Sequence, residues 1–299
     1  MKPLRSTTLV PALASLLMCQ MAAGVNLFDI SFDFGTGENA VPEAYQPMFI
    51  DAANIWKGII PSYIDGNYTE YETVVPGLAI TAGLKALGGV GGILAESGGI
   101  LSARDDGHFE LAWFANINLD SNDAPLLSGG QLTAVIAHEI GHALGFGTLW
   151  EANGLYVPGK VVEGSYVPGS GEYKVGSAAT TAYKTEFNSG ATFVPVETSG
   201  GKGTADAHWQ EIAGGLSDTG WMSGTYNKDM RYELMTGWLN FDPSNQYFIS
   251  DTTVASFRDL GYNTNSGGVF NAVPELSTLS SGFLLLLGVV RRRREARCG

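Results

Sequence analysis

The ten residues AVIAHEIGHA, at positions 134–143, constrain the fold of this chain more than any other stretch. Apolar residues recur around them at the three- and four-residue spacing of a helix with one buried face: Leu132, Val135, Ile136, Ile140 and Leu144. This spacing predicts a helix that begins near Ser128 or Gly129 and ends at about Gly145. The chain must therefore fold around a helix that also carries polar residues at positions 138, 139 and 142.

His138 and His142 are four residues apart, so they share one face of the predicted helix and can direct both rings at one point. Zinc binds histidine nitrogen at about 2.0–2.1 Å, a distance that this spacing allows. Glu139 lies beside the same point, where a carboxylate can accept a proton. The pattern therefore predicts two zinc ligands and a general base on one helical turn.

A catalytic zinc ion needs a third protein ligand and an open coordination position. Two further histidines are available, His108 upstream of a predicted strand and His208 in the stretch GTADAHWQE. A helical glutamate ligand would fall near Glu163, but the surrounding VVEGSYVPG does not predict a helix. Gly145 lets the first helix end sharply, so that a later segment can close the site, and this favours His208.

The remaining patterns predict strands and two more helices. Alternating or β-rich segments predict strands at 27–34, 71–75, 78–82 and 109–119. Helical spacing predicts a helix within 43–60, before Pro61, and another at 252–262. The glycine-rich stretch 83–99 predicts a loop or an irregular hairpin, and residues 151–198 predict irregular hairpins without long helices.

Both ends of the chain have the features of export and sorting sequences. Lys2 and Arg5 precede an apolar run and small residues, so residues 1–24 are predicted to be a secretory signal peptide. Near the other end, a short apolar run at 279–290 is followed by the four consecutive arginines 291–294. The run is short for a bilayer span by itself, and the arginines would stay on the cytoplasmic side.

The ending VPELSTLSSGFLLLLGVVRRRR resembles the PEP-CTERM sorting signal of bacterial exported proteins. The resemblance implies a transient membrane-anchored precursor, processed by signal peptidase and an exosortase-like sorting enzyme, and an extracellular or cell-surface mature protein. Leu276 stands where that signal has its second proline. A plain C-terminal membrane anchor is the alternative.

Cysteine and charge content limit the partners of the body between these ends. The two cysteines, Cys19 and Cys298, lie in the ends, so the body has neither a disulfide nor a thiol ligand. Seven of the 17 Lys and Arg residues lie there too; without them and Glu295, 10 basic and 29 acidic residues remain, a net charge of about −19. This charge disfavours nucleic acid and anionic lipid as partners.

The stretch HEIGHALGFGTLW resembles the metzincin zinc peptidases, and within them the leishmanolysin-like branch, where a long insertion displaces the third histidine. The usual third position, six residues after His142, is Thr148, and His208 follows much later. YELMTGWL supplies Met235, which resembles the methionine turn beneath the metal of that group. Together with GGKGTADAHWQE and ISDTTVASFRDLGY, the resemblance spans about 27–263.

The resemblance implies an α+β fold, with a twisted mixed β-sheet and an active-site helix in an N-terminal lobe at 25–147. A largely irregular C-terminal lobe at 148–265, ending in a helix, would carry the third ligand and Met235. The signal peptide at 1–24 precedes these lobes, and the linker and sorting tail at 266–299 follow them.

The resemblance also implies a secreted endopeptidase that hydrolyses peptide bonds of protein or peptide substrates. One catalytic zinc ion would be held by His138, His142 and His208, with Glu139 as the general base and Met235 beneath the metal. The alternative is a noncatalytic extracellular matrix or surface protein that retains the metalloprotease fold.

The sequence also departs from the family pattern. Leishmanolysins are rich in disulfides and use a propeptide cysteine for latency, whereas the body of this chain has no cysteine. Gly237 stands two residues after Met235, where astacin-type relatives have a tyrosine. The family also implies that the strand at 109–119 is the sheet edge to which an extended substrate adds, an ordinary strand being the alternative.

Two further expectations concern acidic residues. Oxygen ligands that suit calcium occur together at Asp120, Asn122 and Asp123, although their spacing favours a solvated turn over a calcium loop. Asp206 and Glu211 flank His208 and are candidates to orient its ring through a hydrogen bond.

Overall fold

The computed structural model describes residues 28–64, 66, 68–70, 73–105 and 109–272. The predicted signal peptide, the sorting tail with Leu276, both cysteines and His108 lie outside these residues. None of the helices in the described ranges is long and apolar enough to cross a bilayer.

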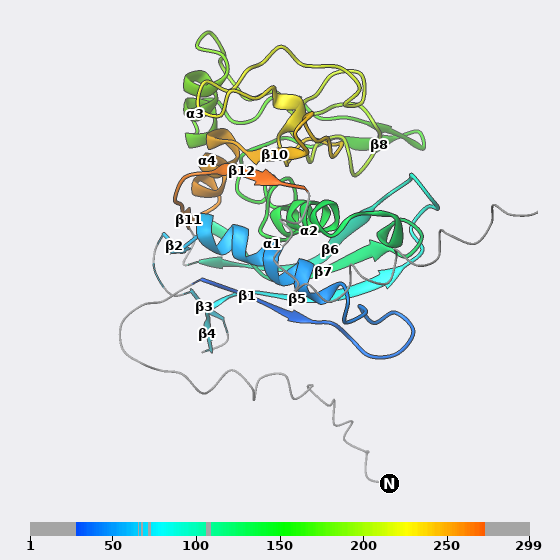
Figure 1. The fold of residues 1–299 in the computed structure, drawn as a ribbon. Coiled ribbons are helices and arrows are strands. Elements are labelled where there is room, and N and C mark those ends of the chain that lie inside the picture. Colours follow the sequence, from blue (N-terminus) through cyan, green and yellow to red (C-terminus); the bar gives the residue numbers. More distant parts are fainter. Residues whose placement is uncertain (1–27, 65, 67, 71–72, 106–108, 273–299) are drawn as a thin grey trace, which may run out of the picture.

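A four-stranded mixed sheet forms one layer of the molecule (Figure 1). Its strands lie in the order β1, β5, β7, β6, in which β6 runs antiparallel to β7 and the other pairs are parallel. Leu78, Ile80 and Ala82 of β5 are buried, which is the two-residue period of a strand with one core face. The strands span Asp29–Asp33 (β1), Gly77–Lys85 (β5), Ala95–Asp105 (β6) and Phe109–Asp120 (β7).

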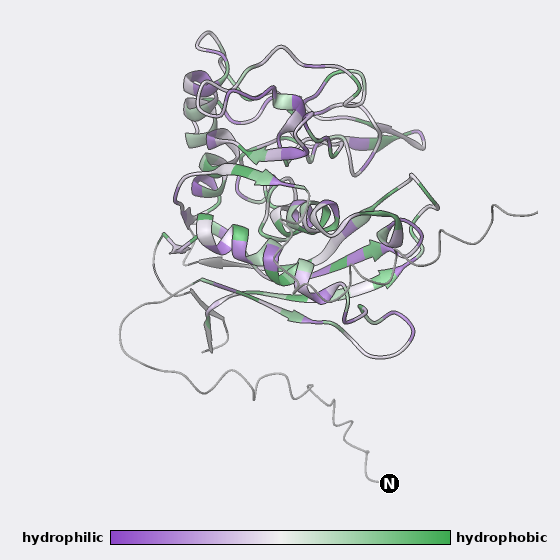
Figure 2. Cartoon of the chain, in the orientation of Figure 1, coloured by the Kyte–Doolittle hydropathy of each residue, from purple (hydrophilic) through white to green (hydrophobic). Residues whose placement is uncertain are grey.

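Two helices, α1 (Gln46–Ile59) and α2 (Gly129–Ala143), lie against each other over one face of this sheet (Figure 1). Apolar and polar residues alternate along α1 with helical spacing, as Figure 2 shows. The Trp56 ring joins the helices, because its Nε1 donates to the Ala137 carbonyl at 2.7 Å. Ser128 and Gln131 form a capping box at the start of α2, which explains why the helix begins there.

The chain after α2 has little regular structure and packs on the helix side of the sheet (Figure 1). Its helices are α3 (Ala178–Glu186), α4 (Asp251–Asp259) and the 3-10 helix η3 (Met230–Tyr232). Its strands are β8 (Lys160–Val162), β9 (Ser165–Val167), β10 (Gln246–Ile249), β11 (Tyr262–Asn263) and β12 (Gly268–Asn271). The short elements before α2 are β2 (Ser62–Tyr63), β3 (Tyr68–Glu70), β4 (Thr73–Val75) and the 3-10 helix η2 (Ala124–Leu126).

Buried aromatic rings form the core between α2 and this later region. The rings of Phe146, Trp150, Tyr173 and Trp209 are fully buried and lie with their centroids 4.7–5.4 Å apart. Trp209 directly follows His208 in the sequence. The aromatic core therefore fixes the position of the chain at His208.

The predicted α+β class is confirmed, with the sheet before the helix of His138 and His142 and a helix near the end. Two local predictions are wrong. The stretch 83–99 is not only a loop, because β5 continues to Lys85 and β6 begins at Ala95. Gly98 marks a register shift in β6, and a glycine at a bulge looks like a loop in sequence.

The other wrong prediction concerns the edge of the sheet. The strand at 109–119 is not the sheet edge, since β7 pairs with β5 on one side and with β6 on the other. The edge strands are β1 and β6. Residues 151–198 contain the β8–β9 hairpin and no long helix, as expected, together with the nine-residue helix α3.

The turn after β7 is solvated only in part, since Asn122 is exposed and Asp123 is buried. Asp120 is fully buried, and its carboxylate accepts main-chain N–H groups of Leu87 at 2.5 Å and Asn122 at 2.6 Å. Hydrogen bonding by the Leu87 N–H lowers the pKa of Asp120. Further N–H donors at Gly88 and Asp123 occupy the same oxygens, so this carboxylate closes the turn and has no lone pairs directed at an ion.

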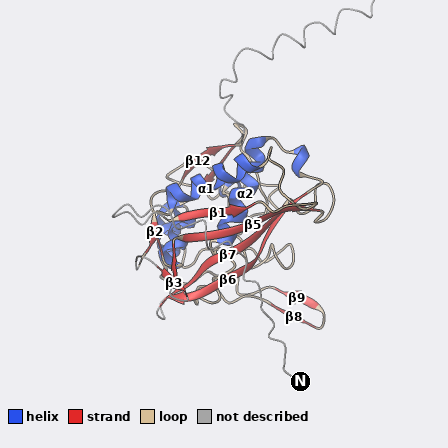
Figure 3. Cartoon of the chain, turned by 90° about the horizontal axis from the view of Figure 1, so that it is seen from below, coloured by secondary structure: helices blue, strands red, loops and turns tan. Residues whose placement is uncertain are grey.

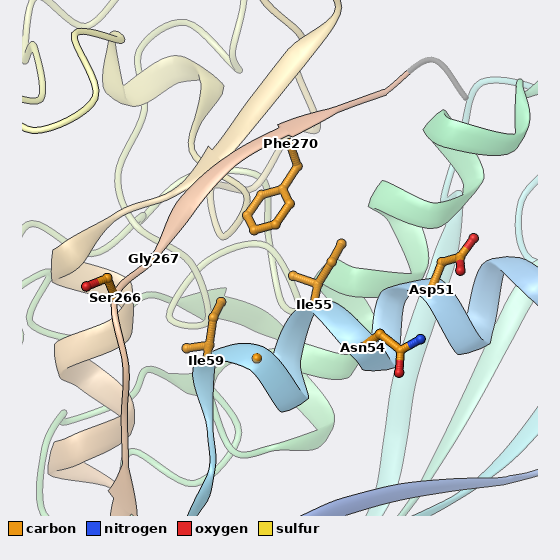
Figure 4. Close-up of a pocket in the computed structure, with 8 residues that line it drawn as sticks. Asp51, Asn54, Ile55, Ile59, Ser266, Gly267 and Phe270 are labelled. Atoms are coloured by element: carbon orange, nitrogen blue, oxygen red, sulfur yellow. The ribbon is translucent and has the colours of Figure 1, made fainter. Parts of the chain in front are cut away.

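A cavity of about 470 Å³ lies between α1 and β12 (Figure 4). Ile55 and Ile59 of α1 and Phe270 of β12 contribute its apolar wall, and Asp51 and Asn54 its polar rim. None of the three histidines of the predicted metal site lines this cavity.

The β8–β9 hairpin projects from the molecule (Figure 3) and is attached at its base through Asp206. The Asp206 carboxylate accepts N–H groups of Gly159 at 2.7 Å and Gly169 at 2.9 Å, and hydroxyl groups of Tyr156 at 2.6 Å and Tyr166. Burial alone would raise the pKa of Asp206, but these hydrogen bonds outweigh it, and the pKa lies below the usual 3.8. The ionised carboxylate therefore stabilises the hairpin.

We predict that Asp206→Asn lowers the free energy of unfolding by about 2 kcal/mol, because charged acceptors form the stronger hydrogen bonds. Asparagine tolerates the left-handed backbone of this position, where φ is +69°. Since the folded-state pKa is lowered, the stabilisation is present above pH 3.8 and is lost as the pH falls below it. Urea unfolding of both proteins should therefore give a difference that narrows between pH 5 and pH 3; a constant difference contradicts the assignment.

Candidate metal centre

Three histidine rings meet beside α2. His138 and His142 lie on that helix, and His208 comes from the irregular region that packs against it. The Nε2 atom of His138 is 3.0 Å from that of His142 and 3.1 Å from that of His208, and the third distance is 3.0 Å. The three residues form a cluster that could hold a metal ion.

Each ring is oriented by a main-chain carbonyl at its other nitrogen. Nδ1 lies 2.6 Å from the Leu234 oxygen in His138, 2.9 Å from the Phe146 oxygen in His142 and 2.8 Å from the Thr204 oxygen in His208. A carbonyl only accepts, so Nδ1 carries the proton in all three neutral rings. Each Nε2 therefore directs a lone pair at the common point, which is the usual arrangement of metal-binding histidines.

Burial keeps these rings neutral. It lowers the pKa of His138 to about 4 and that of His208 to about 3, and it lowers the pKa of His142 well below 6.5. Three Nε2 atoms without hydrogen cannot donate to one another, although they lie at hydrogen-bonding distance. A cation between them would satisfy all three lone pairs at once.

The spacing of the nitrogens fits a first-row transition metal. Atoms 3.0–3.1 Å apart lie roughly 1.7 Å from their common centre, so an ion at about 2.0–2.1 Å from each fits just outside their plane. Imidazole donors suit zinc, copper, iron and nickel. No fourth His, Cys, Asp or Glu atom joins the cluster within the part of the chain that the structure describes.

The end of α2 brings His208 to the helix. The helix ends at Ala143 with Leu144 as its cap, and Gly145 and Gly147 have φ values of +114° and +73°. A Cβ at Gly147 would lie 2.5 Å from the Ala207 oxygen, so only glycine allows residue 207 to approach this closely. Gly147 is therefore a residue of the site that the sequence did not identify.

Met235 packs against the same helical turn from the other side. A Cβ at Gly141 would lie 2.7 Å from the Met235 Sδ atom and 3.1 Å from the Trp56 ring. The glycine between the two histidines thus leaves room for the fully buried methionine. Met235 also accepts the N–H of Trp209 with its carbonyl at 3.1 Å, which links the methionine segment to the His208 segment.

Glu139 directly follows His138 in α2, and it is 7% exposed. Burial and, to a smaller extent, the charge of Glu96 on β6 together raise its pKa to about 8. Among the described residues, none hydrogen-bonds its carboxylate. Glu139 differs in this respect from Glu96, which lies 2.7 Å from the Lys85 Nζ atom. A buried carboxylate without a partner is available to a ligand.

Neither acidic neighbour of His208 orients its ring. Asp206 hydrogen-bonds the β8–β9 hairpin, and Glu211 makes no hydrogen bond to His208. The expectation that they do is wrong, because the Thr204 carbonyl has that role. Glu163 lies in the exposed turn between β8 and β9, at a φ of +50°.

The chain matches no protein-family model, and no curated protein matches it significantly. The interpretation of the metal centre therefore depends on the geometry of its own residues.

We predict that His208→Ala lowers the zinc affinity, because it removes one of three ligands. The loss should exceed the roughly 10–100-fold decrease that follows when a residue hydrogen-bonded to a ligand is removed. Glu163→Ala and His108→Ala should leave the affinity unchanged. Competition with a chromophoric chelator measures all three. Loss of affinity in His108→Ala, with His208→Ala unaffected, would assign the third ligand elsewhere.

We also predict that Gly147→Ala weakens zinc binding, because the new methyl group must push the main chain at Ala207, and His208 with it, away from α2. Gly154→Ala is the matched control: its φ of +63° imposes a similar backbone strain, but no atom lies within 4 Å of the added Cβ. Chelator competition should show a clear loss of affinity for the first variant only. Equal affinities would show that close approach at residue 147 does not position His208.

Proposed function

We propose that this chain is a zinc-dependent endopeptidase with Glu139 as its general base. The observation that carries the proposal is the convergence of three Nε2 atoms at 3.0–3.1 Å beside a buried, unpartnered carboxylate. Structural zinc sites usually have four protein ligands, whereas catalytic sites have three and keep an open position. A purely structural ion would also not need an acidic side chain beside it.

The proposed reaction is hydrolysis of a peptide bond. When bound, zinc supplies Lewis acidity, which polarises a carbonyl and lowers the pKa of water toward about 7. Glu139 takes a proton from the attacking water molecule while the oxygen of that water bonds to the carbonyl carbon. Glu139 then returns that proton to the amide nitrogen as the C–N bond breaks, which leaves a carboxyl group and an amine. The reaction consumes one water molecule.

The environment of Glu139 suits this role only near a cation. Burial by itself favours the neutral acid, and a positive charge held by His138, His142 and His208 favours the carboxylate. His138 is the most exposed of the three rings, so the cluster is reached from its side.

We place the substrate along β6. This strand is one of the two sheet edges, and Glu96 on β6 acts electrostatically on Glu139, which favours this edge over β1. An extended polypeptide would add to β6 through main-chain hydrogen bonds, which fits a protein or peptide substrate. The register shift between Gly98 and Leu101 would divide such a binding edge into two parts.

We also propose that the mature chain acts outside the cytoplasm. The N-terminal signal peptide and the PEP-CTERM-like tail support export through a transient membrane-anchored precursor, with signal peptidase and an exosortase-like enzyme as processing partners. The negative charge of the body disfavours nucleic acid as a partner, which agrees with a protein substrate.

We predict that Glu139→Gln reduces cleavage of unfolded casein by about 10²–10⁴-fold, the usual contribution of a general base, while zinc content stays that of the native chain. Glu151→Gln, at an exposed position in the turn after α2, serves as the control and should retain full activity. Zinc analysis and a peptide-library assay provide the two measurements.

The same measurements separate the alternative function. Bound zinc without Glu139-dependent cleavage of any library peptide would favour a noncatalytic extracellular matrix or surface protein. Activity that persists in Glu139→Gln would assign the base to another residue.

A further inference from the structure

We propose that Glu233 is a positioning residue of the metal centre, which fixes the carbonyl that orients His138. The inference rests on the proposed zinc site and concerns a residue that is no ligand itself. Glu233 is 1% exposed and lies two residues before Met235.

Glu233 joins the methionine segment to the start of α4 through its two carboxylate oxygens. Its Oε2 accepts the N–H of Met235 at 2.6 Å. Its Oε1 accepts the N–H and the hydroxyl of Ser250, both at 3.0 Å, and the hydroxyl of Thr253 at 2.5 Å. Because Ser250 caps α4, the carboxylate also lies at the positive end of that helix dipole.

The orientation of the His138 ring depends on this distant segment, whereas the other two histidine rings are oriented by residues close to them in sequence. The carbonyls that orient His142 and His208 lie four residues away in sequence, in the same local turn. The carbonyl that orients His138 belongs to Leu234, 96 residues away. The ring is held correctly only if Leu234 is held at a fixed place beside α2, and Glu233 bonds the residue that follows it.

The same network reaches the third histidine. The Thr253 hydroxyl donates to Glu233 and accepts the Nε1–H of Trp209 at 2.8 Å. Trp209 follows His208, and its main-chain N–H donates to the Met235 carbonyl. Glu233 therefore connects the segments that position two of the proposed ligands, His138 and His208.

Glu186 provides a matched comparison within the chain. It is also a buried glutamate, with Oε1 accepting from Ser223 at 2.8 Å and Oε2 accepting the N–H and hydroxyl of Thr252 at 2.9 and 3.0 Å. Both glutamates bond the first turn of α4, but Ser223 and Thr252, the partners of Glu186, make no hydrogen bond to Leu234 or Trp209. Loss of either should weaken the fold, and only loss of Glu233 should change the metal centre.

The test compares Glu233→Gln with Glu186→Gln in the full chain. Glutamine keeps the shape but places an amide N–H₂ where one carboxylate oxygen accepts, so Met235 or Ser250 loses its partner. We expect zinc affinity to fall about 10–100-fold in Glu233→Gln and less than about threefold in Glu186→Gln, measured by chelator competition. The absorption spectrum of the Co²⁺-loaded protein should change in Glu233→Gln only, since it reports ligand geometry.

A second variant keeps the test decisive where Glu233→Gln does not fold. Thr253→Val removes the hydroxyl between Glu233 and Trp209 with little change in shape. This variant should also have a lower zinc affinity than the native chain. Thermal unfolding of the metal-free proteins identifies losses of affinity that follow from unfolding.

The possible results separate this proposal from the proposed activity. Equal zinc affinities and Co²⁺ spectra in the Glu233 and Glu186 variants overturn the positioning role alone. A native chain that binds zinc but cleaves no peptide overturns the peptidase and leaves the positioning role standing. A native chain that binds neither zinc nor Co²⁺ overturns both.

Discussion

Three neutral imidazoles with their Nε2 lone pairs about 3 Å apart are the constraint on which the rest of this structure depends. In water such rings would separate or take up a proton, but burial lowers their pKa values and hydrogen bonds at Nδ1 fix their orientation. A cation at the common point would offset the cost of this arrangement. The fold around it, from the aromatic core to the methionine segment, holds the three rings in place.

The sequence predicted the parts of this site that local periodicity determines. Helical spacing located α2 with His138 and His142 on one face, and the flanking glycine located its end. His208 followed from the need for a third ligand, but its orientation by Thr204 did not, because a carbonyl is present at every residue. Gly147 was missed for a similar reason: its role depends on Ala207, sixty residues later, and no local pattern records that contact.

The strand order was also beyond sequence reasoning. The strand β7 contains buried residues such as Ala115 and Ile117 at alternate positions, a pattern that edge and central strands share. Only the pairing of β6 with β7 shows which strand is the edge, and the glycines of β6 at its bulge made that strand look like a loop. The edge beside β7 is therefore β6, one strand away from the predicted one, while the fold class is as predicted.

The irregular region after α2 shows how a chain without cysteine in its body can hold long loops. Buried carboxylates accept main-chain N–H groups there, at Glu186, Glu197, Asp206, Asp229 and Glu233. Each one satisfies donors that a helix or sheet would otherwise satisfy, so these side chains replace regular structure as the local constraint. Glu139 has the same burial but no such donors among the described residues. This carboxylate supports no backbone and directly follows one of the three converging imidazoles, and for that reason our proposal gives it a chemical role.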